Sequence, residues 1–263
     1  MSTNYSGERI AQIKADGGAA LIGYLPVGYP TVRGSIDAVK ALIDGGVDVI
    51  ELGFPYSDPG MDGEVIQRAS EAALARGVKL KDYIAAVEEL APLGAPITLM
   101  SYYNPIHRYG VEAFARDLAN AGAAGVITPD LTPDAGGQWR AAATAAGLEQ
   151  IFLVAPSSTD ERLRMTVEAH RGWIYAASTM GVTGVRAKVD DVARQLVERT
   201  RAAGAELVCV GLGVSNAEQA AELAQYSDGV IVGSAFVRTV GEASAADLAR
   251  LRQLASSIRA GVR

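Results

Sequence analysis

The sequence predicts a (β/α)8 barrel, and three observations support this fold. Short apolar segments alternate with amphipathic, alanine-rich stretches eight times along the chain. Gly and Pro bound the apolar segments, which is typical of parallel strands that are buried on both faces. The length of 263 residues is close to the roughly 250 of such barrels. An open, doubly wound sheet uses the same alternation and is the alternative fold.

The expected strands are short apolar segments spread over the whole chain. They cover residues 19–25, 47–52, 96–101, 124–128, 150–154, 173–177, 207–211 and 229–232. The seven spacers between them carry apolar residues at positions i, i+3 and i+4, as in 37–43 and 189–196, which predicts helices with one buried face. A further helix is expected before the first strand, around 8–14, and another after the last, from 246 to 258.

The spacer between the second and third strands is longer than a single helix requires. It contains a loop rich in Pro and Gly, followed by two helical segments near 65–75 and 81–89. No linker-like or low-complexity segment divides the chain. Residues 1–263 are therefore expected to form one domain, a barrel with an additional N-terminal helix.

Charge and composition exclude several classes of protein. The formal net charge is −6 with acids and bases mixed, so no nucleic-acid-binding surface is indicated. Cys209 is the single cysteine, which excludes an internal disulfide framework. No segment reaches the roughly 18 apolar residues of a membrane span, and the first residues are too polar for a secretory signal. A cytoplasmic location is expected.

Glu51 and Asp62 are the candidate catalytic residues, because barrel active sites form at the carboxyl ends of the strands. Glu51 alternates with Val47 and Val49 along the second strand, so its carboxyl shares an apolar face and resists ionisation. Asp62 follows in the loop after this strand. One carboxyl in an apolar wall and a second on a loop suit acid/base catalysis.

Both carboxylates also have structural interpretations. Glu51 could form an internal salt bridge with Lys14 or Lys188, the lysines nearest to the expected barrel loops. Asp62 precedes Gly63 and could belong to turn chemistry. Asp130 is interpreted as a loop or helix-cap residue.

Three successive late strands end in glycine-bearing turns, which predicts a phosphate site. The turns contain residues 180–184, 211–213 and 232–235. Glycines let backbone N–H groups approach a ligand closely, and Ser234 is expected to cap the helix that follows. The loops after strands seven and eight form the recurrent phosphate site of such barrels.

Other chemistries lack their residues in this sequence. His107 and His170 are isolated, with no cluster at metal-ligand spacing. No expected strand contains a lysine that could form a Schiff base.

Several segments, taken together and in order, resemble the tryptophan synthase alpha chain family. They read IELGFPYSDPGMDG, VIQRAS, LMSYYNPIHRYG, STMGVTG, GLGVSNAEQA and GVIVGSA, and they span nearly the whole chain. The resemblance implies a (β/α)8 barrel that cleaves indole-3-glycerol phosphate to indole and glyceraldehyde 3-phosphate, with Glu51 and Asp62 as its two catalytic acids. It also implies an alpha2-beta2 complex with a beta subunit, which would hold pyridoxal phosphate, so no cofactor is expected on this chain.

The resemblance further implies substrate-binding positions. The indole pocket would be formed by Tyr24, Leu99, Tyr102, Leu153, Tyr175 and Leu212. The phosphate would be bound by Gly184, Gly213, Gly233 and Ser234, with Thr183 on a closing loop.

Two positions depart from the family pattern, and two other functions stay open. Glu64 stands where proline is common, in a stretch expected to approach the partner, and Gly60–Met61 is expected to loosen the loop that carries Asp62. A sugar-phosphate isomerase would use Glu51 as an enolising base and needs a second electrophile that is not evident. A barrel that binds the substrate only to regulate a partner would not need both acids.

Overall fold

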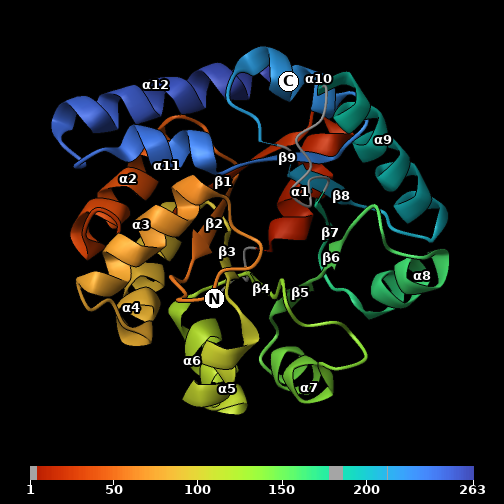
Figure 1. Cartoon of the computed structure of the whole chain (residues 1–263), viewed down its shortest axis with the longest axis horizontal. Helices are drawn as coiled ribbons and strands as arrows, with labels where there is room; N and C mark the ends of the chain where they lie inside the picture. Colours follow the sequence, from red (N-terminus) through yellow and green to blue (C-terminus); the bar gives the residue numbers. More distant parts are fainter. Residues whose placement is uncertain (1–4, 178–185, 212) are drawn as a thin grey trace.

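One parallel sheet forms the centre of the computed structural model, which describes residues 5–177, 186–211 and 213–263 (Figure 1). Within these residues the order of its nine strands is β5-β4-β3-β2-β1-β9-β8-β7-β6. The strands are β1 (Ala20–Pro26), β2 (Val49–Gly53), β3 (Ile97–Met100), β4 (Gly125–Ile127), β5 (Glu149–Ile151), β6 (Leu153–Val154), β7 (Ile174–Ala177), β8 (Val208–Gly211) and β9 (Gly229–Val232).

The two outermost strands of this order are neighbouring pieces of one segment, which closes the sheet into a barrel. β5 pairs with β4, β6 pairs with β7, and only Phe152 separates the two. The expected strand 150–154 is therefore present but divided. The (β/α)8 barrel is confirmed, and the ninth strand arises because each half of this segment pairs with a different neighbour.

Helices surround the strands (Figure 1). They are α1 (Ser6–Ala15), α2 (Val32–Asp44), α3 (Glu64–Ala75), α4 (Leu80–Leu90), α5 (Tyr103–Tyr109), α6 (Val111–Ala121), α7 (Gly137–Ala145), α8 (Asp160–Ala169), α9 (Arg186–Ala202), α10 (Ala217–Ala224), α11 (Ser234–Val240) and α12 (Ala245–Gly261), with a 3-10 turn at Ala91–Leu93. The predicted N-terminal helix is α1. Its Ile10 and Ile13 pack into the inner barrel cluster and so cover the amino-terminal end of the strands.

Of two short helices, α5 was not expected from the sequence, whereas α11 is the helix that was expected to follow the glycine turn at 232–235. Each begins directly at the carboxyl end of a strand and is only seven residues long. Isolated helices of this length are marginal in water, so tertiary contacts must hold them. The carboxylate of Asp130 accepts the Tyr103 N–H at 2.9 Å and so binds the first residue of α5, which agrees with its interpretation as a cap.

The core has two layers, and side-chain parity assigns each strand residue to one of them. Alternate residues such as Ile22, Val49 and Ile231 fill the barrel interior. Their neighbours Ile50 and Leu52 pack between the sheet and the helices. Because side chains alternate along a strand, Glu51 shares the interior face with Val49, as its sequence position predicts.

Carboxylates at the amino-terminal end of the barrel engage the nearby cations. Asp48 accepts the Leu21 N–H at 2.9 Å and pairs with Arg259, which is 7% exposed. Asp228 accepts the Val208 N–H at 2.8 Å and pairs with Lys14 at 3.1 Å. Lys14 therefore lies at the end of the barrel opposite to Glu51, so the predicted alternative of a Lys14–Glu51 salt bridge is wrong.

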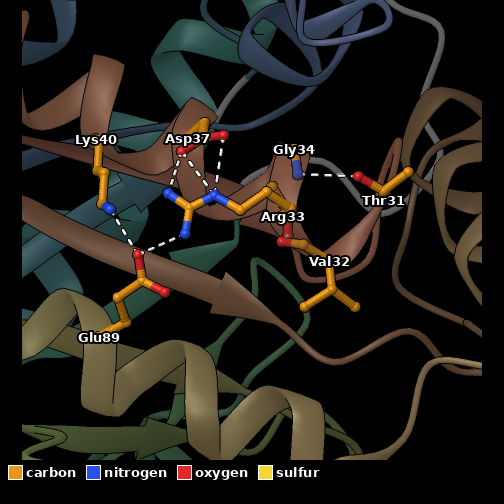
Figure 2. Close-up of polar contacts among 8 residues, drawn as sticks. Thr31, Val32, Arg33, Gly34, Asp37, Lys40 and Glu89 are labelled. Carbon is orange, nitrogen blue, oxygen red and sulfur yellow. Dashed lines mark hydrogen bonds and ion pairs between the residues drawn. The ribbon is translucent and has the colours of Figure 1, made fainter.

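A polar network ties two neighbouring outer helices together, α2 and α4 (Figure 2). The Glu89 carboxylate accepts from Arg33 Nη1 at 2.8 Å and from Lys40 Nζ at 2.6 Å, and Arg33 also pairs with Asp37. At the start of α2, Thr31 Oγ1 accepts the Gly34 N–H and caps the helix. Exposed pairs of this kind add little stability each, so the network chiefly fixes how the two helices face each other.

Candidate active site

A cavity of about 140 Å³ opens at the carboxyl end of the strands, where the fold predicts the site. It brings together the ends of strands that are far apart in the sequence. Its lining consists of Tyr24, Glu51, Asp62, Ile66, Met100, Tyr175, Gly211, Gly213, Ile231, Gly233 and Ser234. Both candidate acids and residues from two of the three glycine turns thus line one cavity.

Glu51 is a buried carboxyl, and few contacts stabilise its ionised form. Its side chain is 1% exposed, and Oε2 has no hydrogen-bond partner among the described residues. Burial raises the pKa of Glu51 from 4.5 to about 8, and the charge of Asp62 adds to the rise. Because removal from water penalises the carboxylate, Glu51 holds a proton at neutral pH.

Asp62 enters the same cavity from the loop after β2. It is partly buried, and this burial raises the pKa of its carboxyl from 3.8 to about 6. Asp62 is therefore mostly ionised near pH 7, whereas Glu51 is mostly protonated. Two carboxyl groups whose pKa values differ in this way can take the separate roles of acid and anion.

Two tyrosines form matching walls of the cavity. Tyr24 of β1 lies in register with Glu51, and a Cβ built on Gly53 would approach its hydroxyl to 2.2 Å. In the same way, a Cβ on Gly211 would approach the hydroxyl of Tyr175 to 2.6 Å. Neither glycine site has room for a Cβ. The ring of Tyr24 therefore packs directly over Gly53 of the neighbouring strand, and the ring of Tyr175 packs over Gly211.

A further part of the cavity lining consists of glycine-bearing turns, and the described lining contains no Lys or Arg. Gly213 has a φ of +56°, a conformation that favours glycine, and Gly233 precedes α11. The prediction that Ser234 caps this helix is wrong, because Gly233 occupies the cap position and Ser234 is the first helical residue. The first N–H groups of a helix have no partner inside it, so they are available to an anion.

Leu99 does not line the cavity, and its predicted place there is corrected. It belongs to the outer cluster between the sheet and the helices, whereas Met100 lies on the cavity wall. The error is one residue, and a shift of one residue moves a strand side chain to the opposite face. The register of Thr98 with Glu51 shows why, since Thr98 and Met100 share the interior face.

The other predicted positions lie at the edges of the cavity or outside the described residues. Leu153 packs against the inner cluster, in register with Tyr175. Tyr102 is 7% exposed and its hydroxyl accepts the Met61 N–H at 3.0 Å. Thr183, Gly184 and Leu212 lie outside the described residues.

Sequence reasoning did not single out three apolar residues of the cavity wall, Ile66, Met100 and Ile231. Two of them could have been found from the alternation of side chains along a strand, because residues two positions apart share a face. Met100 follows Thr98 by two residues, and Ile231 precedes the glycine turn by two. Ile66 stands in the first turn of α3, and only the path of the preceding loop brings it to the cavity.

A larger cavity, of about 430 Å³, lies at the amino-terminal end between α1 and the segment before β5. Its buried carboxyl, Glu149, already accepts from Ser6 N and Gly7 N at 3.0 and 2.8 Å. The Glu149 carboxylate therefore binds the start of α1, and we do not regard this cavity as a candidate site for acid/base catalysis.

Neither a metal centre nor a membrane span is found in the part of the chain that the structure describes. No group of three or more His, Cys, Asp or Glu side chains there could hold a metal ion. No helix among these residues is long and apolar enough to cross a membrane.

The fold and the cavity define the class of this protein: a (β/α)8 barrel with a candidate active site at the carboxyl ends of its strands. The family model of the tryptophan synthase alpha chain matches residues 10–262. The tryptophan synthase alpha chain of Thermobifida fusca is 56% identical over 260 residues, which cover 97% of this chain and 96% of the relative. That of Mycobacterium tuberculosis is 57% identical over 250 residues, which cover 95% and 91%.

Solved structures agree with the sequence comparisons. A chain of M. tuberculosis tryptophan synthase has a TM-score of 0.91 at 55% identity and covers 98% of this chain and 97% of its own length. A mutant tryptophan synthase alpha-subunit from Pyrococcus furiosus has a TM-score of 0.84 at 33% identity, with 92% and 98% covered. The chain belongs to the tryptophan synthase alpha chain family. It is a lyase of tryptophan biosynthesis that cleaves indole-3-glycerol phosphate to indole and glyceraldehyde 3-phosphate.

Proposed function

We propose that Glu51 and Asp62 are the acid and the anion of this cleavage. One observation carries the proposal: a buried glutamic acid, whose Oε2 has no hydrogen-bond partner among the described residues, lines the same small cavity as a partly buried aspartate. With pKa values of about 8 and about 6, Glu51 is mostly protonated and Asp62 mostly ionised near pH 7.

The reaction needs a proton at C3 of the indole ring before the carbon–carbon bond can break. Glu51 gives its proton to C3, and the ring becomes an indolenine with positive charge at its nitrogen. The Asp62 carboxylate accepts a hydrogen bond from the ring N–H and stabilises this charge in a site shielded from water.

Bond cleavage then returns the proton to the enzyme. The Glu51 carboxylate removes the proton from the side-chain hydroxyl beside the bond to be broken, and a carbonyl forms there. The electron pair of the carbon–carbon bond moves into the indolenine and restores indole. Glu51 is protonated again, so the cycle needs no external proton.

The cavity walls support a placement of the substrate between these groups. Tyr24, Met100 and Tyr175 would contact the indole ring, with Tyr102 and Leu153 at the edge, and we propose Met100 in place of Leu99. Leu212 and Thr183 stay predictions for the same pocket. Fixing both ends of the substrate lowers the entropic cost of the reactive geometry.

We propose that backbone N–H groups bind the phosphate of the substrate. Gly213, Gly233 and Ser234 line the cavity, and Gly184 stays a prediction for the same site. The described lining contains no Lys or Arg, so amides and the start of α11 would carry the interaction.

Gly233→Val is expected to weaken phosphate binding selectively. A Cβ at Gly233 would lie 3.4 Å from Tyr24 and 3.5 Å from Ile66, so a branched side chain would fill the space of the ligand. Titration calorimetry should show a large loss of affinity for glycerol 3-phosphate and a small one for indole. Equal losses for both ligands would contradict the amide site.

We further propose that this chain acts with a tryptophan synthase beta subunit in an alpha2-beta2 complex, and that the beta subunit holds the pyridoxal phosphate. Pyridoxal phosphate forms a Schiff base with a lysine, and the described lining of the cavity contains none. Solved relatives of this chain are structures of tryptophan synthase from M. tuberculosis.

One assay tests both parts of the function. The purified chain, alone and with its beta subunit, is incubated with indole-3-glycerol phosphate while indole is measured. We expect indole from the chain alone and a higher rate in the complex, whose mass by light scattering should fit two copies of each subunit. No indole under either condition would reject the cleavage, and another mass would reject only the stoichiometry.

A further inference from the structure

The loop that carries Asp62 has little packing of its own. Gly60 and Gly63 flank Asp62 at short range, and a Cβ built on either would meet no atom within 4 Å. Met61, the residue directly before Asp62, is 36% exposed. The position of the Asp62 carboxyl must therefore depend on a few directed contacts rather than on close packing.

Two side-chain hydrogen bonds hold the backbone of this loop, one on each side of Asp62. The Tyr102 hydroxyl accepts the Met61 N–H at 3.0 Å, and Gln67 Nε2 donates to the Asp62 carbonyl oxygen at 2.7 Å. The first comes from the end of β3 and the second from α3, so the two contacts approach from different elements.

The tyrosine contact is itself braced by other residues at the rim of the barrel. The Tyr102 ring stacks on Tyr56 at a centroid distance of 4.8 Å and an interplanar angle of 22°. The Tyr56 hydroxyl accepts from Asn104 Nδ2 at 3.2 Å. Tyr102 is 7% exposed, so its hydroxyl is held at a fixed place against the loop.

We propose that Gln67 and Tyr102 are positioning residues. Their side chains hydrogen-bond to the loop backbone at the Met61 N–H and the Asp62 carbonyl, and so hold the Asp62 carboxylate at the reacting end of the substrate. This inference rests on the proposed role of Asp62. The role of Gln67 is separate from substrate contact, because Gln67 does not line the cavity.

Matched substitutions can separate this role from a general effect on the fold. Tyr102→Phe keeps the stacked ring and removes only the hydroxyl, and Gln67→Met keeps the length of the side chain and removes only the amide. Tyr109→Phe and Gln138→Ala serve as controls, because the Tyr109 hydroxyl bonds to Asp117 and the Gln138 amide to Glu112, both on the exposed surface.

Loss of either contact should lower kcat by about tenfold or more, because small displacements of a catalytic group are costly. The KM for indole-3-glycerol phosphate and the affinity for glycerol 3-phosphate should change little, since the phosphate end stays intact. The two controls should retain wild-type kinetics.

The pH profile of kcat/KM supplies a readout that a purely structural defect would not move. Asp62 owes its raised pKa to burial, and the titratable groups that face it in the described part of the chain are Glu51, Tyr24, Tyr102 and Tyr175. A loosened loop exposes the carboxyl to water, so its pKa falls and the acidic limb of the profile moves to lower pH. The phosphate of the substrate also titrates near pH 6, so the limb is compared between variants with the same substrate.

Each outcome has a separate meaning when Asp62→Asn is measured in parallel. A fall in kcat with a shifted acidic limb in both variants supports the proposal. Wild-type kcat, or a fall without a shift of the limb, overturns it. An Asp62→Asn variant that keeps its turnover rejects the proposed role of Asp62 itself, whereas an inactive Asp62→Asn with unaffected positioning variants rejects only this inference.

Discussion

Glu51→Gln is expected to reduce cleavage of indole-3-glycerol phosphate on the order of 10² to 10⁴-fold, the range for a well-placed acid/base group. The amide keeps the size of the side chain but has no proton that it can transfer to carbon. Because Glu51 is already uncharged near neutral pH, the substitution should leave the fold and the binding of indole and glycerol 3-phosphate intact. Indole release measures the loss.

Glu64→Gln is the matched control, because Glu64 is an exposed residue of α3 whose carboxylate pairs with Arg68 on its own helix. It should keep the wild-type rate in the isolated chain. A Glu51→Gln variant with near wild-type turnover would reject the acid role of Glu51.

The same variant should change how stability depends on pH. The folded pKa of Glu51, about 8, lies above its ordinary value of 4.5, so this group contributes most to stability at low pH. Its contribution falls as the pH rises from about 4.5 to about 8, because the unfolded chain ionises first. Urea denaturation across this range should show a smaller decline for Glu51→Gln than for the wild type.

Asp62→Asn should lower turnover by about 10² to 10³-fold, because the neutral amide cannot stabilise positive charge on the indole nitrogen. The wild-type kcat/KM should rise as Asp62 ionises, near pH 6, and fall as Glu51 loses its proton, near pH 8. In the variant, the acidic limb that belongs to Asp62 disappears.

The basic limb should move as well. The charge of Asp62 contributes to the raised pKa of Glu51, so the neutral amide should lower that pKa and shift the limb to lower pH. Asp58→Asn is the control, because Asp58 is exposed and its carboxylate accepts a hydrogen bond from the neighbouring Ser57. Full activity of Asp62→Asn, or an unmoved basic limb, would contradict the electrostatic coupling of the two acids.

Local patterning predicted the barrel well because each strand is buried on both faces. The last strand was placed at 229–232, and β9 covers the same residues. The alternation of Val47, Val49 and Glu51 predicted a carboxyl on an apolar face, and the structure places Glu51 inside the barrel. Such patterns can be read from the sequence because side-chain direction in a strand follows from residue number alone.

Features that depend on contacts between distant segments could not be predicted in this way. The division of the fifth strand at Phe152 follows from barrel closure, in which its two halves pair with different neighbours. The exchange of Leu99 for Met100 follows from the register of β3 against β2. Gln67 carried no sequence signal, since its significance arises only where α3 meets the loop of Asp62.

The amino-acid sequence by itself determined the alternation of strands and helices, the two carboxyl groups and the glycine turns, because each depends on neighbours only a few residues away. The tertiary structure decided which of these groups share a cavity and what their charge states are. Burial and the charge of Asp62 raise the pKa of Glu51, and both depend on segments that only the closed barrel brings together.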